Sequence, residues 1–245
     1  MNAPSHQLDH VALGLPRIAD ALPFVVGELG GERFDCGPGM GFQWVQWRFP
    51  GGGVIELLEP AGEPGGFLHR FLESRGPGIH HVTFKVPDLE VAAERAREAG
   101  YTIVGWFDAD PHWKECFLHP KQAQGIVVQL AQASAGDGGW EDRPRVALPD
   151  PPEPAGEPVR LLGLRLAARD ADAVRRQWQI ALGGAPYDAP DGRLGFCWER
   201  SGLRIEVAIR PEAEQGPLQI ELATGRPWPD DGHDALGTRF VRGDA

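Results

Sequence analysis

The segment Gly78-Ile79-His80-His81-Val82-Thr83-Phe84-Lys85-Val86 decides the predicted fold. From His81 onward polar and apolar residues alternate, as they do in a half-buried strand. The earlier segment Leu8-Asp9-His10-Val11-Ala12-Leu13 has the same pattern, and its histidine lies 71 residues before His81. A helix-like run and three further strand-like runs follow each histidine strand. The sequence therefore predicts a tandem repeat of βαβββ units.

Both copies of the unit can be followed along the chain. In the first copy, apolar residues at helical spacing and later alternating runs predict a helix and three strands at 17–29, 33–36, 42–49 and 54–58. The second copy has its strands and helix at 80–86, 89–99, 102–107, 115–118 and 126–130. We predict an α+β protein in which residues 7–132 form one complete domain, with two units curved around a shared cavity.

The chain beyond this domain is predicted to hold a third, incomplete copy. Residues 133–158 are rich in proline, glycine and acidic residues and read as a semi-extended linker. A strand-like and a helix-like run then repeat the start of the chain at an offset of 153 residues. We predict a degenerate, truncated unit at 159–225 and a tail at 226–245.

Composition and charge exclude several classes of protein. A formal net charge of -11 would repel a phosphate backbone, so we expect no nucleic-acid partner. Three widely spaced cysteines without a C-x-x-C pair indicate neither a disulfide framework nor a cysteine zinc site. No long apolar segment and no leader-like start is found, so we expect a cytoplasmic protein that does not enter a membrane.

Strand parity places four side chains that can bind a metal on the cavity side. Glu56 follows His10 by 46 residues, and Gln129 follows His81 by 48, each in the last strand of its unit. Two histidines and two oxygen donors at matching positions predict a site for one divalent ion of Fe, Mn, Co, Ni or Zn. The alternative is that both histidines are polar residues on the open face of a sheet.

The third copy lacks the histidine of the first two. At the offset of 153 residues His10 becomes Gly163 and Ala12 becomes Arg165, whereas Glu206 keeps the carboxylate of Glu56. We expect Arg165 to pair with Glu206 and no metal to bind there. The third copy would then serve to pack against the first domain, to complete a substrate wall, or to support a homodimer through an exposed sheet edge.

These units resemble the vicinal oxygen chelate superfamily, which includes glyoxalases, bleomycin-resistance proteins and dioxygenases. The resemblance rests on Leu8-Asp-His-Val-Ala, Ile55-Glu-Leu-Leu-Glu-Pro60, Gly78-Ile-His-His-Val-Thr-Phe and Gly125-Ile-Val-Val-Gln-Leu130. Within the superfamily the chain is most similar to methylmalonyl-CoA epimerases and glyoxalase I. The resemblance implies metal ligands at His10, Glu56, His81 and Gln129.

Two features depart from the epimerase pattern. The family has glutamine in the first unit and glutamate in the second, and here Glu56 and Gln129 stand the other way round. The family also has a glutamate near the third strand of its first unit, but residues 41–47 offer only Gln43 and Gln46. Because an amide cannot take a proton from carbon, a second base is missing from that strand.

We therefore expect a metal-dependent lyase or isomerase that acts on a small carbonyl, hydroxy-acid or acyl-thioester substrate through a metal-stabilised enolate. Glu56 would be the catalytic carboxylate. The first alternative is a non-haem iron ring-cleaving or related dioxygenase, since two histidines and a glutamate can form its iron site. The second is a non-catalytic, resistance-type protein that binds a ligand in a similar cavity.

Four further residues are candidates for contact with the substrate. Lys121 and His119 lie in a predicted turn, where the lysine could meet a carboxylate or phosphate but could equally be solvated. Trp113 lies in a loop expected near the cavity mouth. Trp44 belongs to an aromatic strand that could line an apolar wall or pack in the core.

Overall fold

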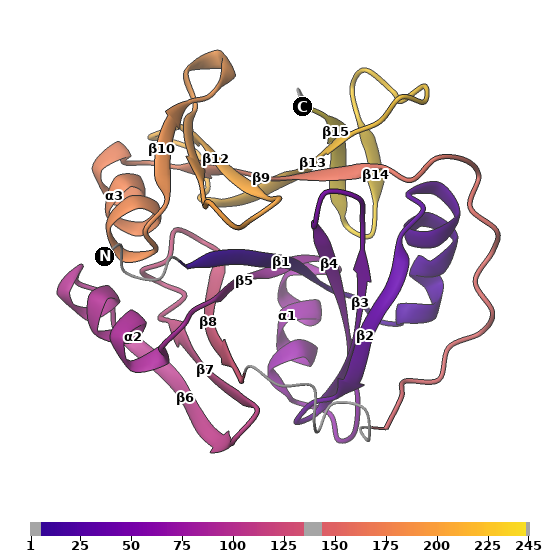
Figure 1. Cartoon of the computed structure of the whole chain (residues 1–245), viewed down its shortest axis with the longest axis horizontal. Coiled ribbons are helices and arrows are strands. Elements are labelled where there is room, and N and C mark those ends of the chain that lie inside the picture. The colour runs from indigo at the N-terminus through magenta and orange to yellow at the C-terminus, as the bar shows by residue number, and fades with distance from the viewer. Residues whose placement is uncertain (1–5, 135–143, 244–245) are drawn as a thin grey trace. The chain divides into compact units, whose positions relative to one another are not determined.

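A computed structural model of the chain describes residues 6–134 and 144–243 (Figure 1). Its first sheet has eight strands, ordered β2-β3-β4-β1-β5-β8-β7-β6. In chain order these are β1 (Gln7–Gly14), β2 (Glu32–Pro38), β3 (Phe42–Arg48), β4 (Val54–Pro60), β5 (Gly78–Lys85), β6 (Ile103–Asp110), β7 (Trp113–Leu118) and β8 (Val127–Ala133). The helical elements here are η1 (Ile18–Ala21), η2 (Pro23–Glu28), α1 (Phe67–Arg75) and α2 (Leu89–Glu98). The predicted pair of βαβββ units is confirmed.

The second sheet has seven strands, ordered β10-β11-β12-β9-β13-β15-β14. They are β9 (Arg160–Ala168), β10 (Ala185–Asp188), β11 (Leu194–Cys197), β12 (Arg204–Ile209), β13 (Gly216–Ala223), β14 (His233–Ala235) and β15 (Thr238–Arg242). The helical elements here are α3 (Ala171–Arg175), η3 (Arg176–Ala181) and η4 (Pro190–Gly192). This strand order repeats that of the first sheet, except that no described strand takes the place of β6.

The third copy of the unit is therefore more complete than the sequence indicated. Strands β9 to β12 and their helix form a full βαβββ unit, because β10 supplies the strand that the prediction lacked. Residues 226–245, predicted as a tail, include β14 and β15. Strand β13 pairs with β15 in parallel, and β15 pairs with β14 antiparallel, as in the last part of a βαβββ unit. A fourth copy is thus reduced to three strands.

The chain divides into two compact units. Of the described residues, one contains 6–9, 81–134 and 163–218, and the other contains 10–80, 144–162 and 219–243. In the first, the Phe84 ring packs edge-on against Trp198, and Arg95 donates to the Ile180 carbonyl at 2.6 Å. In the second, Phe24 stacks on His233. Each compact unit therefore combines one βαβββ unit of the first sheet with strands of the second sheet.

The helical segment after β1 is interrupted at Pro23. We predicted one regular helix over 17–29, and this is wrong in its internal geometry: a 3₁₀ turn, η1, is followed by the wider turns of η2. Proline has no backbone N–H and cannot continue the regular hydrogen-bond ladder. The Leu29 N–H instead bonds the Phe24 carbonyl at 2.8 Å, five residues back, as in a π-helix.

The same wide turn recurs 153 residues later. The Leu182 N–H bonds the Gln177 carbonyl at 3.0 Å, which is the counterpart of the Leu29 bond to Phe24. A π-type turn is rare, so its presence at equivalent positions shows that the first and third copies share an unusual local geometry. The offset found in the sequence is therefore also an offset in structure.

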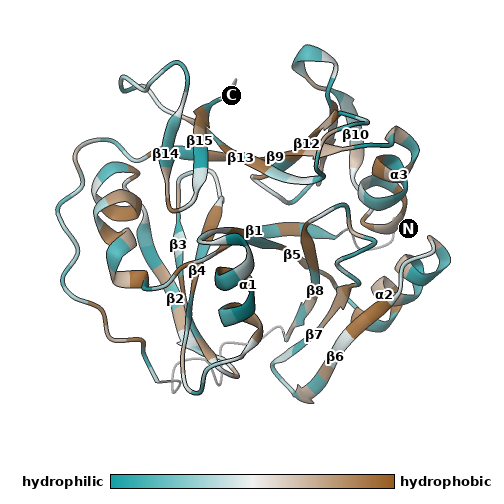
Figure 2. Ribbon diagram, turned by 180° about the vertical axis from the view of Figure 1, so that it is seen from behind, coloured by the Kyte–Doolittle hydropathy of each residue, from teal (hydrophilic) through white to brown (hydrophobic). Residues whose placement is uncertain are grey.

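Helix α2 shows why the second unit folds as predicted. Its N-terminal N–H groups are capped by Asp88, whose carboxylate accepts from Val91 at 3.0 Å, and by Gln132 of β8, which accepts from Leu89 at 2.8 Å. The helix buries one apolar stripe, and Figure 2 shows hydrophobic and hydrophilic residues along its length. No helix in the described part of the chain is long and apolar enough to cross a membrane.

The predicted linker, residues 133–158, falls partly outside the described residues. Ala133, its first residue, ends β8, and the described residues from 144 to 158 contain no helix or strand. The Val146 carbonyl accepts a hydrogen bond from Arg33 at 2.6 Å, and the Ala155 N–H bonds the Gly27 carbonyl at 2.7 Å. The described part therefore follows β2 and η2 as an extended chain held by specific hydrogen bonds.

A buried histidine makes stability depend on pH. Burial, together with the positive charge of Arg95, lowers the pKa of His6 to about 4 from an ordinary value of 6.5. The unfolded chain therefore takes up a proton more readily than the folded chain between pH 6.5 and 4, and stability falls as the pH is lowered through this range. We expect His6 to contribute about 2 kcal/mol of this loss between pH 7 and 5. Urea unfolding at the two pH values should show a smaller loss in His6→Gln, and an equal loss would contradict the assignment.

Candidate metal centre

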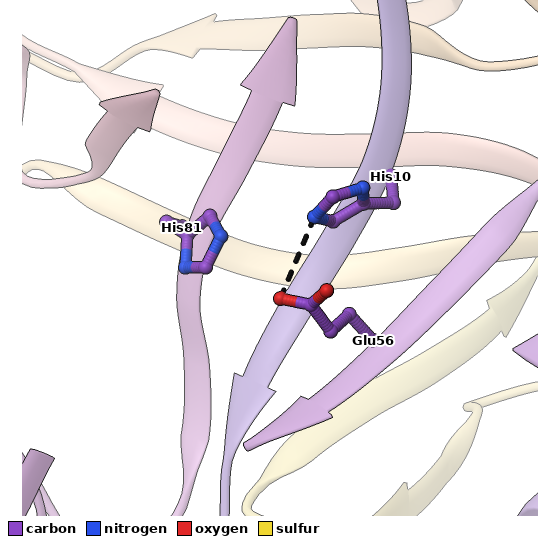
Figure 3. A group of neighbouring side chains, drawn as sticks. All are labelled: His10, Glu56 and His81. Atoms are coloured by element: carbon purple, nitrogen blue, oxygen red, sulfur yellow. Dashed lines mark ion pairs between the residues drawn. The ribbon is translucent and has the colours of Figure 1, made fainter. Parts of the chain in front are cut away.

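Three ligand-type side chains come together from three strands of the first sheet. His10 lies in β1, Glu56 in β4 and His81 in β5, and one ligand atom of each lies within 4.8 Å of those of the other two (Figure 3). His10 Nε2 is 3.6 Å from Glu56 Oε1. All three residues are buried, at 2%, 8% and 6% exposure. The histidine–glutamate–histidine part of the predicted site is thus assembled in the structure.

Strand pairing explains why residues far apart in sequence meet here. Strand β1 pairs in parallel with β4, and Ala12 lies opposite Glu56 in the register. His10 is two residues before Ala12 and so shares its face of the sheet. Ile55 and Leu57, which flank the glutamate, face the other side and are fully buried. The alternation read from the sequence therefore places His10 and Glu56 on one face.

The donor set suits a divalent metal ion. Imidazole nitrogens and carboxylate oxygens bind such ions at about 2.0–2.2 Å, so ligand atoms around one ion are about 3–4 Å apart. The observed spread of up to 4.8 Å needs only small side-chain rotations to reach this geometry. A buried carboxylate is costly unless a cation compensates its charge. A cation between Glu56 and the two imidazoles would supply that compensation.

Gln129, the fourth predicted ligand, is held by hydrogen bonds at both ends of its amide. Its Oε1 accepts from Thr83 Oγ1 at 2.5 Å, and its Nε2 donates to Glu115 Oε2 at 2.6 Å. Thr83 is the direct partner of Gln129 in the pairing of β5 with β8. A carbonyl oxygen has two lone pairs, so one remains for another partner. The role of Gln129 as a ligand stays a prediction.

Sequence reasoning missed Glu115. It was predicted only as the start of a strand, but it lies within β7, on the same face as Trp113 and Phe117. The Trp113 indole Nε1 donates to Glu115 Oε2 at 2.6 Å, the oxygen that also accepts from Gln129. The alternation of β7 indicates which face carries Glu115, but not which side chains it contacts. A second carboxylate therefore adjoins a predicted ligand, in the second unit.

Glu56 also has an amide partner. Gln46 of β3 lies directly opposite Glu56 in the register, and its Nε2 donates to Glu56 Oε2 at 2.8 Å. This bond orients the carboxylate so that its other oxygen, Oε1, is the one near His10. The absence of a carboxylate from residues 41–47 thus leaves an amide that positions Glu56.

The remaining predicted substrate contacts lie in different surroundings. Trp113 is half-buried beside Glu115, whereas Lys121 is exposed in the turn after β7. The Lys121 N–H donates to His119 Nδ1 at 3.3 Å, so this imidazole stabilises the turn. Trp44 packs with Phe42 against a small apolar cluster of β1, β4 and α1, composed of Ala12, Leu58 and Leu68. Their contact with a substrate remains a prediction.

His80, the neighbour of His81, has a packing role. Its ring lies 4.8 Å from that of Phe71 and 5.4 Å from that of Phe67, both in α1. Burial lowers the pKa of His80 to about 4, against the opposing influence of Glu56. The imidazole is therefore neutral at ordinary pH and packs against the rings of Phe67 and Phe71.

The third copy cannot place a histidine at the position of His10. Gly163 has φ of 151°, and a Cβ atom there would lie 1.9 Å from the Arg204 carbonyl oxygen. Any side chain would force the parallel strands β9 and β12 apart. The backbone itself therefore excludes this ligand.

Arginines surround the remaining carboxylate of the third copy. Glu206 is only 1% exposed and lies opposite Arg165 in the register of β12 with β9. The predicted pair is found, with Arg165 Nε 3.7 Å from Glu206 Oε2. Arg193 and Arg204 approach the carboxylate at 2.8 and 3.1 Å, and the Tyr187 hydroxyl donates to it at 2.9 Å. Fixed positive charges thus compensate the carboxylate in the third copy.

Comparison with known proteins identifies the family. A family model described as the Glyoxalase/Bleomycin resistance protein/Dioxygenase superfamily matches residues 9–117. The ethylmalonyl-CoA/methylmalonyl-CoA epimerase of Cereibacter sphaeroides is 35% identical over 134 residues, which are 51% of this chain and 97% of that relative. This chain belongs to the Glyoxalase/Bleomycin resistance protein/Dioxygenase superfamily. The resemblance inferred from the sequence is confirmed.

Two further comparisons each cover about half of the chain. The mitochondrial methylmalonyl-CoA epimerase of Bos taurus is 29% identical over 133 residues, covering 52% of this chain and 74% of that protein. The crystal structure of a hypothetical protein from Bacillus halodurans C-125 is 27% identical, with a TM-score of 0.50, and covers 55% of this chain and 99% of that chain. The superfamily match to residues 9–117 includes His10, Glu56 and His81.

The buried Glu206 carboxylate and its arginines predict that Glu206→Gln strongly lowers the stability of the chain. Glu206→Gln removes a buried negative charge and leaves three guanidinium groups without their shared partner. We expect a loss of about 3 kcal/mol in the free energy of unfolding. Arg175→Ala, which breaks an exposed pair with Asp172, is the matched control and should cost less than about 1 kcal/mol. Denaturant unfolding measures both, and equal small losses would contradict the assigned role of Glu206.

Proposed function

We propose that the chain is a metal-dependent isomerase that moves a proton on the carbon next to the thioester carbonyl of an acyl-CoA. The buried group of His10, Glu56 and His81, within a segment similar to characterised epimerases, carries this proposal. The similar proteins are epimerases of methylmalonyl-CoA or ethylmalonyl-CoA by name. The carbon between a thioester and a carboxylate in such compounds carries an acidic proton, so the reaction needs a base and stabilisation of an oxyanion.

The two histidines and the glutamate would hold the metal. A divalent ion supplies Lewis-acid stabilisation of the negative charge that develops on the substrate's oxygens. His10 and His81 would bind it as neutral imidazoles, which would leave Glu56 as the anionic residue of the group. The low exposure of all three side chains keeps water away from the site and strengthens electrostatic interactions there.

Glu56 would move the proton. The Gln46 amide holds one carboxylate oxygen, Oε2, and thereby restricts the rotation of the group. The other oxygen, Oε1, lies on the His10 side, in the buried group where the substrate's carbonyl would bind. A positioned general base contributes about 10²–10⁴-fold to such a reaction. Glu56 therefore combines two roles, ligand and base, which a single measurement of activity would not separate.

Exchange of deuterium from solvent tests this proposal. The metal-loaded chain is incubated in D₂O with methylmalonyl-CoA or ethylmalonyl-CoA, and the substrate is analysed by mass spectrometry. Deuterium should appear at the carbon between the thioester and the carboxylate. Glu56→Gln should slow exchange by at least about 100-fold because it removes the base. Metal content is measured on the same preparations, so that loss of the ion is recognised.

Glu63→Gln is the matched control, since Glu63 is exposed. It should exchange at the wild-type rate. Absence of exchange with both substrates in the metal-loaded wild type would sink the isomerase assignment. Undiminished exchange in Glu56→Gln would overturn the role of Glu56 alone.

A further inference from the structure

The Glu115–Gln129 contact is a charge-assisted hydrogen bond between β7 and β8. Gln129 is 8% exposed, and its amide nitrogen lies 2.6 Å from Glu115 Oε2. The same oxygen accepts from the Trp113 indole N–H, also at 2.6 Å. Both donors lack any acceptor capacity, so Glu115 must be the acceptor in both bonds. Trp113 thus holds the Glu115 carboxylate in place, and Glu115 in turn holds the Gln129 amide.

This arrangement determines which way the amide of Gln129 points. If the amide were turned over, its oxygen would lie 2.6 Å from a carboxylate oxygen, and two acceptors would repel each other. The Thr83 hydroxyl cannot decide the matter, because it can either donate or accept. Glu115 therefore sets the orientation, with the amide oxygen on the side of β5, the strand that carries His81.

The first unit also pairs an amide with a carboxylate, but at another register: Gln46 lies directly opposite Glu56, whereas Phe117, and not Glu115, lies opposite Gln129. There the residue of the last strand, Glu56, is the carboxylate, and Gln46 of the preceding strand is the amide that donates to it at 2.8 Å. In the second unit the last strand supplies the amide, Gln129, and the preceding strand supplies the carboxylate, Glu115. Each unit thus has one amide and one carboxylate. Where the last strand carries a glutamate its hydrogen-bond partner is a glutamine, and where it carries a glutamine its partner is a glutamate.

We propose that Glu115 is a positioning residue that presents the carbonyl oxygen of Gln129 to the metal and makes it a stronger donor. An N–H bond to a carboxylate draws electron density toward the carbonyl oxygen, which compensates in part for the absence of a carboxylate ligand in the second unit. This inference rests on the proposed function, because it requires a metal at His10, Glu56 and His81.

Binding of Co²⁺ alone, measured by calorimetry and by visible absorption, tests the inference. Glu115→Leu removes the acceptor and should weaken Co²⁺ binding by about 10–100-fold, the usual effect of losing a partner of a metal ligand. The absorption bands of bound Co²⁺ should also shift, because the oxygen donor is weakened or lost. Glu63→Leu removes a carboxylate from an exposed residue and is the matched control, with binding unchanged.

A double variant separates positioning from a general structural role. Gln129→Glu combined with Glu115→Gln gives the second unit the polarity of the first unit, with a carboxylate ligand and an amide donor. We expect it to bind Co²⁺ at least as tightly as the wild type, while Glu115→Gln alone binds more weakly. This comparison does not depend on whether Glu115→Leu folds, which thermal unfolding will show.

The outcomes are distinguishable. Wild type that binds no Co²⁺ overturns the proposed metal-dependent function, and the role of Glu115 with it. Wild-type affinity in a folded Glu115→Leu or in Glu115→Gln overturns only the role of Glu115. Failure of the double variant to regain affinity likewise contradicts positioning, because a merely structural glutamate would not be rescued by the exchange.

Discussion

The parallel pairing of the first and last strands of each βαβββ unit is the constraint on which the site depends. In the first unit it brings Ala12 opposite Glu56, and in the second it brings Thr83 opposite Gln129. A histidine two residues before each of these partners, His10 or His81, then shares their face of the sheet. The same parallel pairing in the two units therefore accounts for the positions of His10, Glu56, His81 and Gln129.

The third copy keeps the parallel pairing of its first and last strands but has no histidine at the position of His10. Its strands β9 and β12 pair in the same way, and Glu206 still lies opposite its partner in β9. Gly163 approaches the Arg204 carbonyl so closely that no side chain fits, and arginines compensate the buried carboxylate. Fixed guanidinium groups compensate the buried glutamate of the third copy, whereas the proposed metal ion would compensate Glu56 in the first unit.

Much of the first sheet could be predicted from the sequence because the repeat allowed one copy to check the other. His10, Glu56 and His81 were found in this way, since each has a counterpart at a matching position. Glu115 had none, because residues 41–47 of the first unit carry no carboxylate. Its importance depends on contacts with Trp113 and Gln129 that alternation alone does not reveal.

Irregular and short elements were the harder part. Pro23 replaces a regular helix with wide turns, and the apolar spacing of 17–29 is compatible with both geometries. Strands β10, β14 and β15 have only three to five residues, too few for alternation to stand out. Pairing with neighbouring strands, which is a property of the tertiary structure, is what makes them strands.

X-ray absorption spectroscopy of the metal-loaded chain tests the central assignment most directly. The spectrum should show two imidazole nitrogens and at least one carboxylate oxygen at about 2.0–2.2 Å from the ion. A shell made only of oxygen donors, or one that contains sulfur, would contradict a metal centre at His10, Glu56 and His81.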